Sequence, residues 1–60
     1  MTTLSFVDAL SRPRGWVELN QDGDVVRASD AFTFMQRIGY SADGVRGYAL
    51  MYNLDIVETK

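Results

Sequence analysis

Few side chains in this chain of 60 residues could take part in catalysis. The sequence has no histidine and no cysteine, which removes the commonest general base, the thiolate nucleophile and the nitrogen and sulfur ligands of zinc. The closest carboxylate pair is Asp22 and Asp24, which we expect at an exposed turn tip, where general acid catalysis is disfavoured. Serine hydroxyls lack a histidine to activate them. These residue types predict a protein that is not an enzyme and that has no cofactor.

The segment around Asp22 is similar to a calcium-binding loop. Glu18, Asn20 and Asp22 are spaced two apart, and Gly23 stands where such a loop turns sharply. The bidentate glutamate that the twelfth position requires is replaced by Ser29. Since flanking helices are also absent, the sequence favours a hairpin here and predicts no metal site.

The charge balance also limits the partners of the protein. Six basic and eight acidic side chains give a net charge of −2, whereas a DNA-binding domain of this size usually has a basic excess. Composition therefore disfavours non-specific binding to nucleic acid. No apolar run approaches the roughly 20 residues that cross a bilayer. We expect a cytoplasmic protein with no membrane partner.

The length allows one small domain, residues 1–60. We expect its first element to be a short helix over residues 2–11, because a threonine can cap it and apolar side chains fall near one helical face. Those apolar residues are Leu4, Phe6, Val7 and Leu10. Pro13 cannot continue a helix, so residues 12–15 are predicted to form a loop.

A β-hairpin is the strongest local signal in the sequence. Asp22 and Gly23 separate two β-favouring runs, 16–21 and 24–28, and both residue types tolerate the positive φ angles of a two-residue turn. This register pairs Glu18 with Arg27 and Leu19 with Val26. It predicts a core face of Val17, Leu19, Val26 and Ala28, and an outer face of Trp16, Glu18, Asn20, Val25 and Arg27.

A central helix is predicted next. Ser29 is a suitable N-cap, Asp30 is favourable in the first turn, and Gly39 is suited to end the helix. Apolar residues recur at helical spacing, namely Ala31, Phe34, Met35 and Ile38, while Phe32 falls to one side.

The last third of the chain fits two descriptions. Apolar residues alternate over 48–57, which is typical of a strand, but Ser41 could also cap a helix that Asn53 ends. An isolated hairpin is only marginally stable, so a third strand is favoured. The predicted fold is therefore α+β: a short N-terminal helix, a β-hairpin, a central helix, and then a third strand or, alternatively, a second helix.

The alternative ending gives residues 31–52 a resemblance to a helix-turn-helix unit. Gly39 would form the turn, Ser41 would cap the second helix, and Val45 would pack back on the first. Met35 departs from the small residue that this family prefers. The resemblance implies a small dimeric DNA-binding transcriptional regulator whose DNA-facing residues are Arg37, Ala42, Asp43, Arg46 and Gly47.

The seven aromatic residues exceed what one small core needs, and tryptophan, tyrosine and arginine are enriched at interface hot spots. We expect a partner-binding surface that uses Trp16, Glu18, Asp22, Asp24, Arg27, Asp43, Tyr48 and Tyr52. In size, acidity and lack of catalytic groups, the chain resembles small inhibitors of phages and mobile elements, including anti-CRISPR proteins. The resemblance implies a non-catalytic binding protein that occludes a host protein or nucleoprotein complex, such as a CRISPR effector, in the host cytoplasm. A homodimer is a further expectation.

Overall fold

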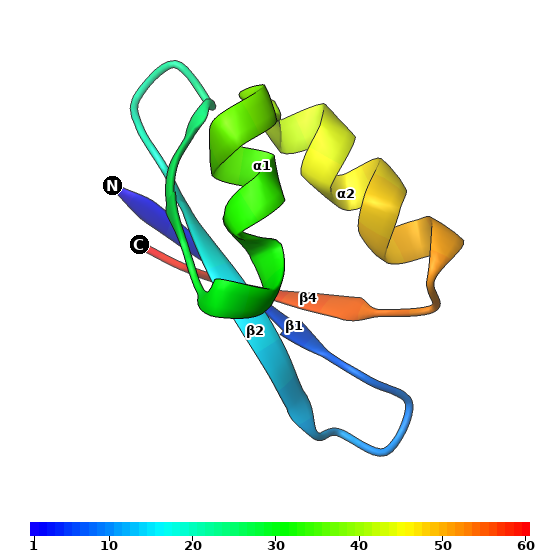
Figure 1. Cartoon of the computed structure of the whole chain (residues 1–60). Coiled ribbons are helices and arrows are strands. Elements are labelled where there is room, and N and C mark those ends of the chain that lie inside the picture. The colour runs from blue at the N-terminus through cyan, green and yellow to red at the C-terminus, as the bar shows by residue number, and fades with distance from the viewer.

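A computed structural model describes residues 1–60 as a four-stranded antiparallel sheet with two helices. The strands are β1 (Thr2–Val7), β2 (Pro13–Leu19), β3 (Val25–Ala28) and β4 (Asp55–Thr59), in the spatial order β3-β2-β1-β4. A 3₁₀ turn, η1 (Asp30–Phe32), leads into α1 (Thr33–Ile38), and α2 (Ala42–Met51) follows (Figure 1). The α+β class is confirmed.

The first element is strand β1, so the predicted helix over residues 2–11 is wrong. Leu4 and Phe6 are fully buried on one side of β1, while Thr3 and Ser5 point to the other side. The alternation of buried and less buried residues along the strand explains this segment better than helical spacing does. Leu10, which the helical face would include, lies in the following loop and is 71% exposed. β1 occupies the middle of the sheet, where it pairs with both β2 and β4.

β2 and β3 form the predicted hairpin, with Glu18 opposite Arg27. β2 already begins at Pro13, so the predicted loop over residues 12–15 is wrong for residues 13–15, which extend the strand through pairing with β1. The register shifts by one residue immediately after Glu18, so that Leu19 lies opposite Val25 and not opposite Val26. Val25 is consequently buried in the core, whereas Val26 is only half-buried. The predicted core face is therefore wrong for Val26, and the predicted outer face is wrong for Val25.

The hairpin turn is also wider than the predicted two-residue turn. The side-chain Oδ1 of Asn20 accepts hydrogen bonds from the backbone N–H groups of Asp22 and Asp24, both at 3.0 Å. The backbone N–H of Asn20 donates to the carbonyl oxygen of Asp24 at 3.0 Å. Gly23 takes the positive φ of 83° that closes this turn.

The central helical segment starts after Ser29 and ends at Gly39, as predicted, and Gly39 has a left-handed φ of 85°. Its first turn is 3₁₀, with about three residues per turn, which rotates the buried face relative to the predicted stripe. Phe32 and Met35 are therefore buried, whereas Ala31 and Ile38, two members of the predicted apolar stripe, are exposed.

The last third contains a helix and then a strand. Ser41 caps α2 by accepting a hydrogen bond from the backbone N–H of Gly44 at 3.4 Å. Asn53, with a φ of 56°, follows the helix, and β4 then pairs with β1. The predicted strand over 48–57 is therefore wrong for residues 48–54, of which 48–51 belong to α2. The observed strand, β4, begins at Asp55.

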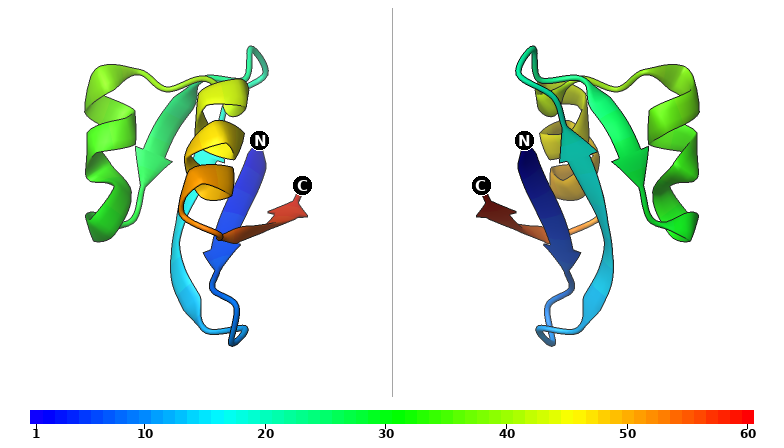
Figure 2. Two further views of the ribbon diagram at one scale, coloured as in Figure 1. Left: turned by 90° about the vertical axis from the view of Figure 1, so that its right-hand side faces the viewer. Right: turned by 90° about the vertical axis from the view of Figure 1, so that its left-hand side faces the viewer.

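The core lies between the helices and one face of the sheet. Figure 2 shows α2 in front of β1 and β2 in one view and behind them in the other, so the opposite face stays uncovered. The core consists of nine buried apolar residues, namely Leu4, Phe6, Val17, Leu19, Val25, Phe32, Met35, Val45 and Ala49. No polar side chain is buried with them.

Candidate functional site

The sheet face that the helices leave uncovered carries a shallow pocket of about 390 Å³. We call this surface the open face, and its pocket is lined by Thr3, Ser5, Trp16, Glu18 and Arg27. Strand register brings these residues together. Ser5 lies opposite Trp16, and Glu18 lies between Thr3 on β1 and Arg27 on β3. Directly opposed residues of antiparallel strands share a face, so the five side chains form one continuous patch.

Arg27 links the charged and aromatic parts of the open face. Its Nε lies 3.3 Å from Glu18 Oε1, and its Cζ lies 6.0 Å from the centroid of the Trp16 ring. This distance is at the outer limit of a cation–π contact. The Glu18–Arg27 pair is partly exposed and contributes little to stability, so its main effect is to hold the guanidinium beside the indole ring.

Trp16 is held in place by its backbone. Its N–H donates to the side-chain Oγ of Ser29 at 3.0 Å, and the N–H of Ser29 donates to the carbonyl oxygen of Trp16 at 3.0 Å. These two bonds tie β2 to the residue that precedes η1. The indole ring is half-buried and lies outside the core cluster. The open face therefore presents a fixed aromatic surface surrounded by two hydroxyls and one ion pair.

The eight predicted partner-binding residues fall into three groups. Trp16, Glu18 and Arg27 lie together on the open face. Asp22 and Asp24 belong to the hairpin turn, which contacts the start of α2 because the carbonyl oxygen of Gly23 accepts from the N–H of Ala42 at 2.8 Å. Asp43, in the first turn of α2, lies near that end of the hairpin. No group of three or more histidine, cysteine, aspartate or glutamate side chains is arranged to hold a metal ion.

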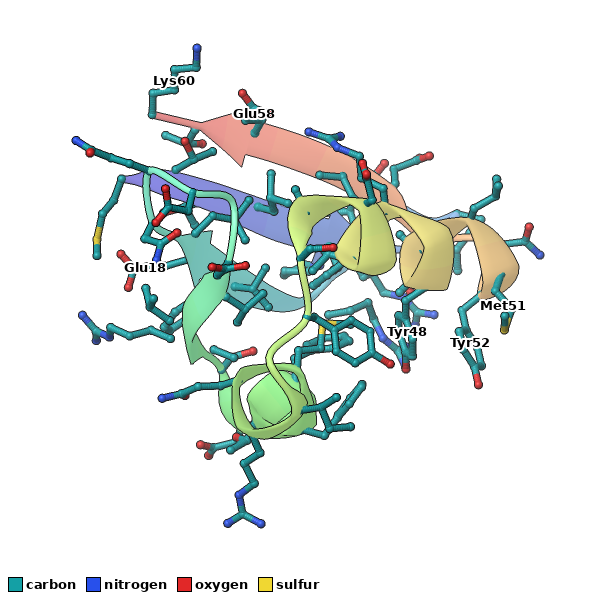
Figure 3. All side chains as sticks on the ribbon, turned by 90° about the horizontal axis from the view of Figure 1, so that it is seen from above. Glu18, Tyr48, Met51, Tyr52, Glu58 and Lys60 are labelled. Atoms are coloured by element: carbon teal, nitrogen blue, oxygen red, sulfur yellow. The ribbon has the colours of Figure 1, made fainter.

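Tyr48 and Tyr52 form the third group, on the helical side of the molecule. Figure 3 shows them on the opposite side from Glu18. They line a second, more enclosed pocket of about 270 Å³, which we call the aromatic pocket. Its other lining residues are Asp8, Arg14, Phe32 and Leu54.

Sequence reasoning missed several residues of these two pockets. Thr3 and Ser5 were placed in a helix, although their alternation with Leu4 and Phe6 is the signal that would have put them on one strand face. Asp8 and Arg14 join the aromatic pocket through the tertiary fold, because they flank the β1–β2 loop and lie far from α2 in the sequence. No local pattern indicates that contact.

The predicted DNA-facing residues do not form a basic surface. Arg46 is the one arginine of α2, and its Nη2 donates to Glu58 Oε1 at 2.9 Å. Asp43 adds a negative charge to the same helix, and Ala42 packs against the core. Gly47 is exposed but has no side chain, and Arg37 lies on the separate helix α1.

Scans of protein families, curated proteins and solved structures find no match for this chain. Neither helix has the length and apolar character that crossing a membrane requires.

Proposed function

We propose that the protein is a non-catalytic binding protein and that a partner protein docks on the open face. One observation carries the proposal: Trp16, the single tryptophan, lies on the sheet face that the helices do not cover. The solvated face of an antiparallel sheet ordinarily carries polar residues. A tryptophan with an arginine beside it has instead the composition of an interface hot spot.

Each residue of the open face has a distinct part in this binding. The indole ring of Trp16 provides apolar area that loses water when the partner docks. Arg27 and Glu18 keep exposed polar atoms that can bond to the partner's backbone or side chains. The hydroxyls of Thr3 and Ser5 can each donate and accept a hydrogen bond. The strand pairing fixes the backbone of these residues, so the partner binds without a cost for ordering the sheet.

Inhibition by surface occlusion is the specific role that we propose. The absence of histidine and cysteine and the acidic composition support a protein that acts by occupying a surface. A host nucleoprotein complex, such as a CRISPR effector, is the partner that the resemblance to small phage and mobile-element inhibitors implies. That identity stays a prediction, and it is tested by identifying the captured partner.

A small dimeric helix-turn-helix regulator is the second candidate. Its requirement for a helix over 41–52 is largely met, because α2 follows α1 across the short turn at Gly39. We rank it below the first proposal since Arg46 is paired with Glu58 and Asp43 would lie near DNA phosphates. The two functions are separated by a mobility-shift assay at low salt, where a regulator binds DNA and the inhibitor does not.

Capture of a partner by variants of the open face tests the first proposal. The tagged protein is used to isolate its partner from a lysate of the source cells, and the purified pair is then measured by calorimetry. Trp16→Ala should weaken binding about 30-fold or more, as removal of a hot-spot residue does. The core does not contain Trp16, so circular dichroism should show a native fold.

Ile38→Ala is the matched control because Ile38 is a large apolar residue that is 71% exposed on α1. It should leave the affinity unchanged. Equal affinity of the wild-type protein and Trp16→Ala for every isolated partner would refute docking on the open face.

A further inference from the structure

The aromatic pocket is a second cavity that the proposed function does not use. It lies between the β1–β2 loop and the C-terminal half of α2, and its volume of about 270 Å³ suits a single side chain rather than a large ligand. Four of its six lining residues are apolar or aromatic, namely Phe32, Tyr48, Tyr52 and Leu54. Tyr52 is 58% exposed and, as Figure 3 shows, stands beside Met51 at the end of the helix.

The walls of this pocket are formed before any ligand binds. The Tyr48 ring meets the Phe32 ring edge-on, with centroids 5.9 Å apart, and lies 4.5 Å from the Tyr52 ring. Phe32 is itself buried in the core. The backbone N–H of Leu54 donates to the carbonyl oxygen of Ala49 at 2.8 Å, which fixes the chain after α2. A ring that enters this pocket therefore meets positioned aromatic surfaces.

The rim of the pocket carries an excess positive charge. The Oδ2 atom of Asp8 accepts a hydrogen bond from Arg12 Nε at 3.0 Å, and Arg14 Nη1 lies 3.7 Å from the same oxygen. Two guanidinium groups thus share one carboxylate. Asp8 Oδ1 already accepts from the backbone N–H groups of Leu10 and Arg12.

Arg14 is the group of this rim that is best placed to bind an anion. It makes no hydrogen bond to Asp8 at 3.7 Å, and its side chain is 56% exposed. Its N–H donors therefore stay available for a carboxylate, which a guanidinium can bind with two parallel hydrogen bonds. A cationic ligand would instead meet two arginines and a carboxylate that is already bonded.

We propose that the aromatic pocket binds the C-terminal residue of a peptide or protein that ends in an aromatic side chain. The ring occupies the cavity that Phe32, Tyr48, Tyr52 and Leu54 line, and the α-carboxylate pairs with Arg14. The pocket has room for about one residue, and Arg14 belongs to its lining. A C-terminal residue fits this arrangement because it carries both the ring and the α-carboxylate. This inference does not depend on the open face, since the two pockets share no residue.

Nuclear magnetic resonance titration with two small probes tests the proposal. N-acetylphenylalanine carries the free carboxylate, and N-acetylphenylalanine amide is its neutral counterpart. Both should shift the backbone signals of Tyr48, Tyr52 and Leu54, with affinities in the millimolar range expected for so small a ligand. The acid should bind about tenfold more tightly at low salt, and this advantage should shrink as salt is added.

Two variants and one control assign the contacts. Arg14→Gln should abolish the preference for the acid while leaving binding of the amide unchanged, and Tyr52→Ala should weaken both probes. Arg37→Gln, on α1, removes an exposed arginine that lines neither pocket and should change neither. The proposal is overturned if acid and amide bind equally to the wild-type protein, if the shifts fall outside the pocket, or if neither probe binds.

Discussion

Replacement of Gly15 by alanine should destabilise the protein more than any other exchange of a glycine. Gly15 has a φ of 154°, a backbone conformation that side chains disfavour. A Cβ atom at this position would lie 2.4 Å from Cε2 and 2.5 Å from Cδ2 of Phe32, and 2.7 Å from Oγ of Ser29. Carbon atoms rest at about 3.5–4.0 Å from one another. The Phe32 ring would therefore have to move by about 1 Å.

That movement is costly because the ring is enclosed. Phe32 is only 5% exposed, and its ring centroid lies 4.4 Å from that of Phe6. Overpacking of a core costs about 1–3 kcal/mol, and a disfavoured φ costs a similar amount. Displacement of Ser29 would also lose the 3.0 Å hydrogen bond from the N–H of Trp16, which contributes about 1 kcal/mol. We expect the free energy of unfolding to fall by about 3–7 kcal/mol in total. This loss is comparable with the entire free energy of unfolding, about 3–9 kcal/mol, of a chain of this length.

Urea unfolding, followed by the fluorescence of Trp16 and by circular dichroism, measures this effect. Gly39→Ala is the matched control, because Gly39 also has a positive φ, 85°, but has no atom within 4 Å of the added Cβ. Gly39→Ala should lower the free energy of unfolding by only about 1–2 kcal/mol, the cost of placing a residue other than glycine in the left-handed conformation. If Gly15→Ala is no less stable than Gly39→Ala, the close approach of Phe32 to β2 is wrong.

Substitutions at three further positions test other features of the fold. Gly47→Ala should raise the urea midpoint by the equivalent of about 0.5–1 kcal/mol, because Gly47 lies within α2 with nothing near the added Cβ; a lower midpoint would contradict this environment. Ser41→Ala should lower the free energy of unfolding by about 0.5–1 kcal/mol, because the N–H of Gly44 loses its hydrogen-bond acceptor. Ser41→Asp, which restores an acceptor, should retain most of the stability in the same assay. The backbone N–H of Arg12 is the main cause that lowers the pKa of Asp8 below its ordinary 3.8, against the opposing effect of desolvation. Asp8 therefore stabilises the fold above pH 3.8 and loses that contribution as the pH falls through its lowered pKa; Asp8→Asn should remove this part of the pH dependence of the urea midpoint, and an unchanged profile would refute the assignment.

Local signals in the sequence predicted the parts of the fold that depend on a few neighbouring residues. Gly39 and Asn53 take left-handed conformations, and Ser41 caps α2, because these residue types satisfy the backbone at helix ends. The pairing of Glu18 with Arg27 also follows from the position of the hairpin. These features need no knowledge of the rest of the chain.

The errors arose where the partner of a segment is distant in sequence. Apolar residues between Leu4 and Leu10 also fall near one helical face, and the strand is stabilised by pairing with β2 and β4, which lie later in the sequence. The change of register at Leu19 accompanies a distant contact, because the N–H of Val25 donates to the carbonyl oxygen of Tyr40 at 2.9 Å. For the same reason, the open face was predicted only in part, through Trp16, Glu18 and Arg27.

The central position of β1 has a consequence for how the protein folds during synthesis. Thr3 pairs with Glu18 on one side and with Thr59 on the other, so the first and last strands of residues 1–60 are paired with each other. Until residues 55–59 emerge, one edge of β1 stays unpaired and can template the strands of another nascent chain. Contacts of such long sequence separation also form slowly. The edge of β1 that β4 covers is therefore open to pairing with other chains until β4 attaches.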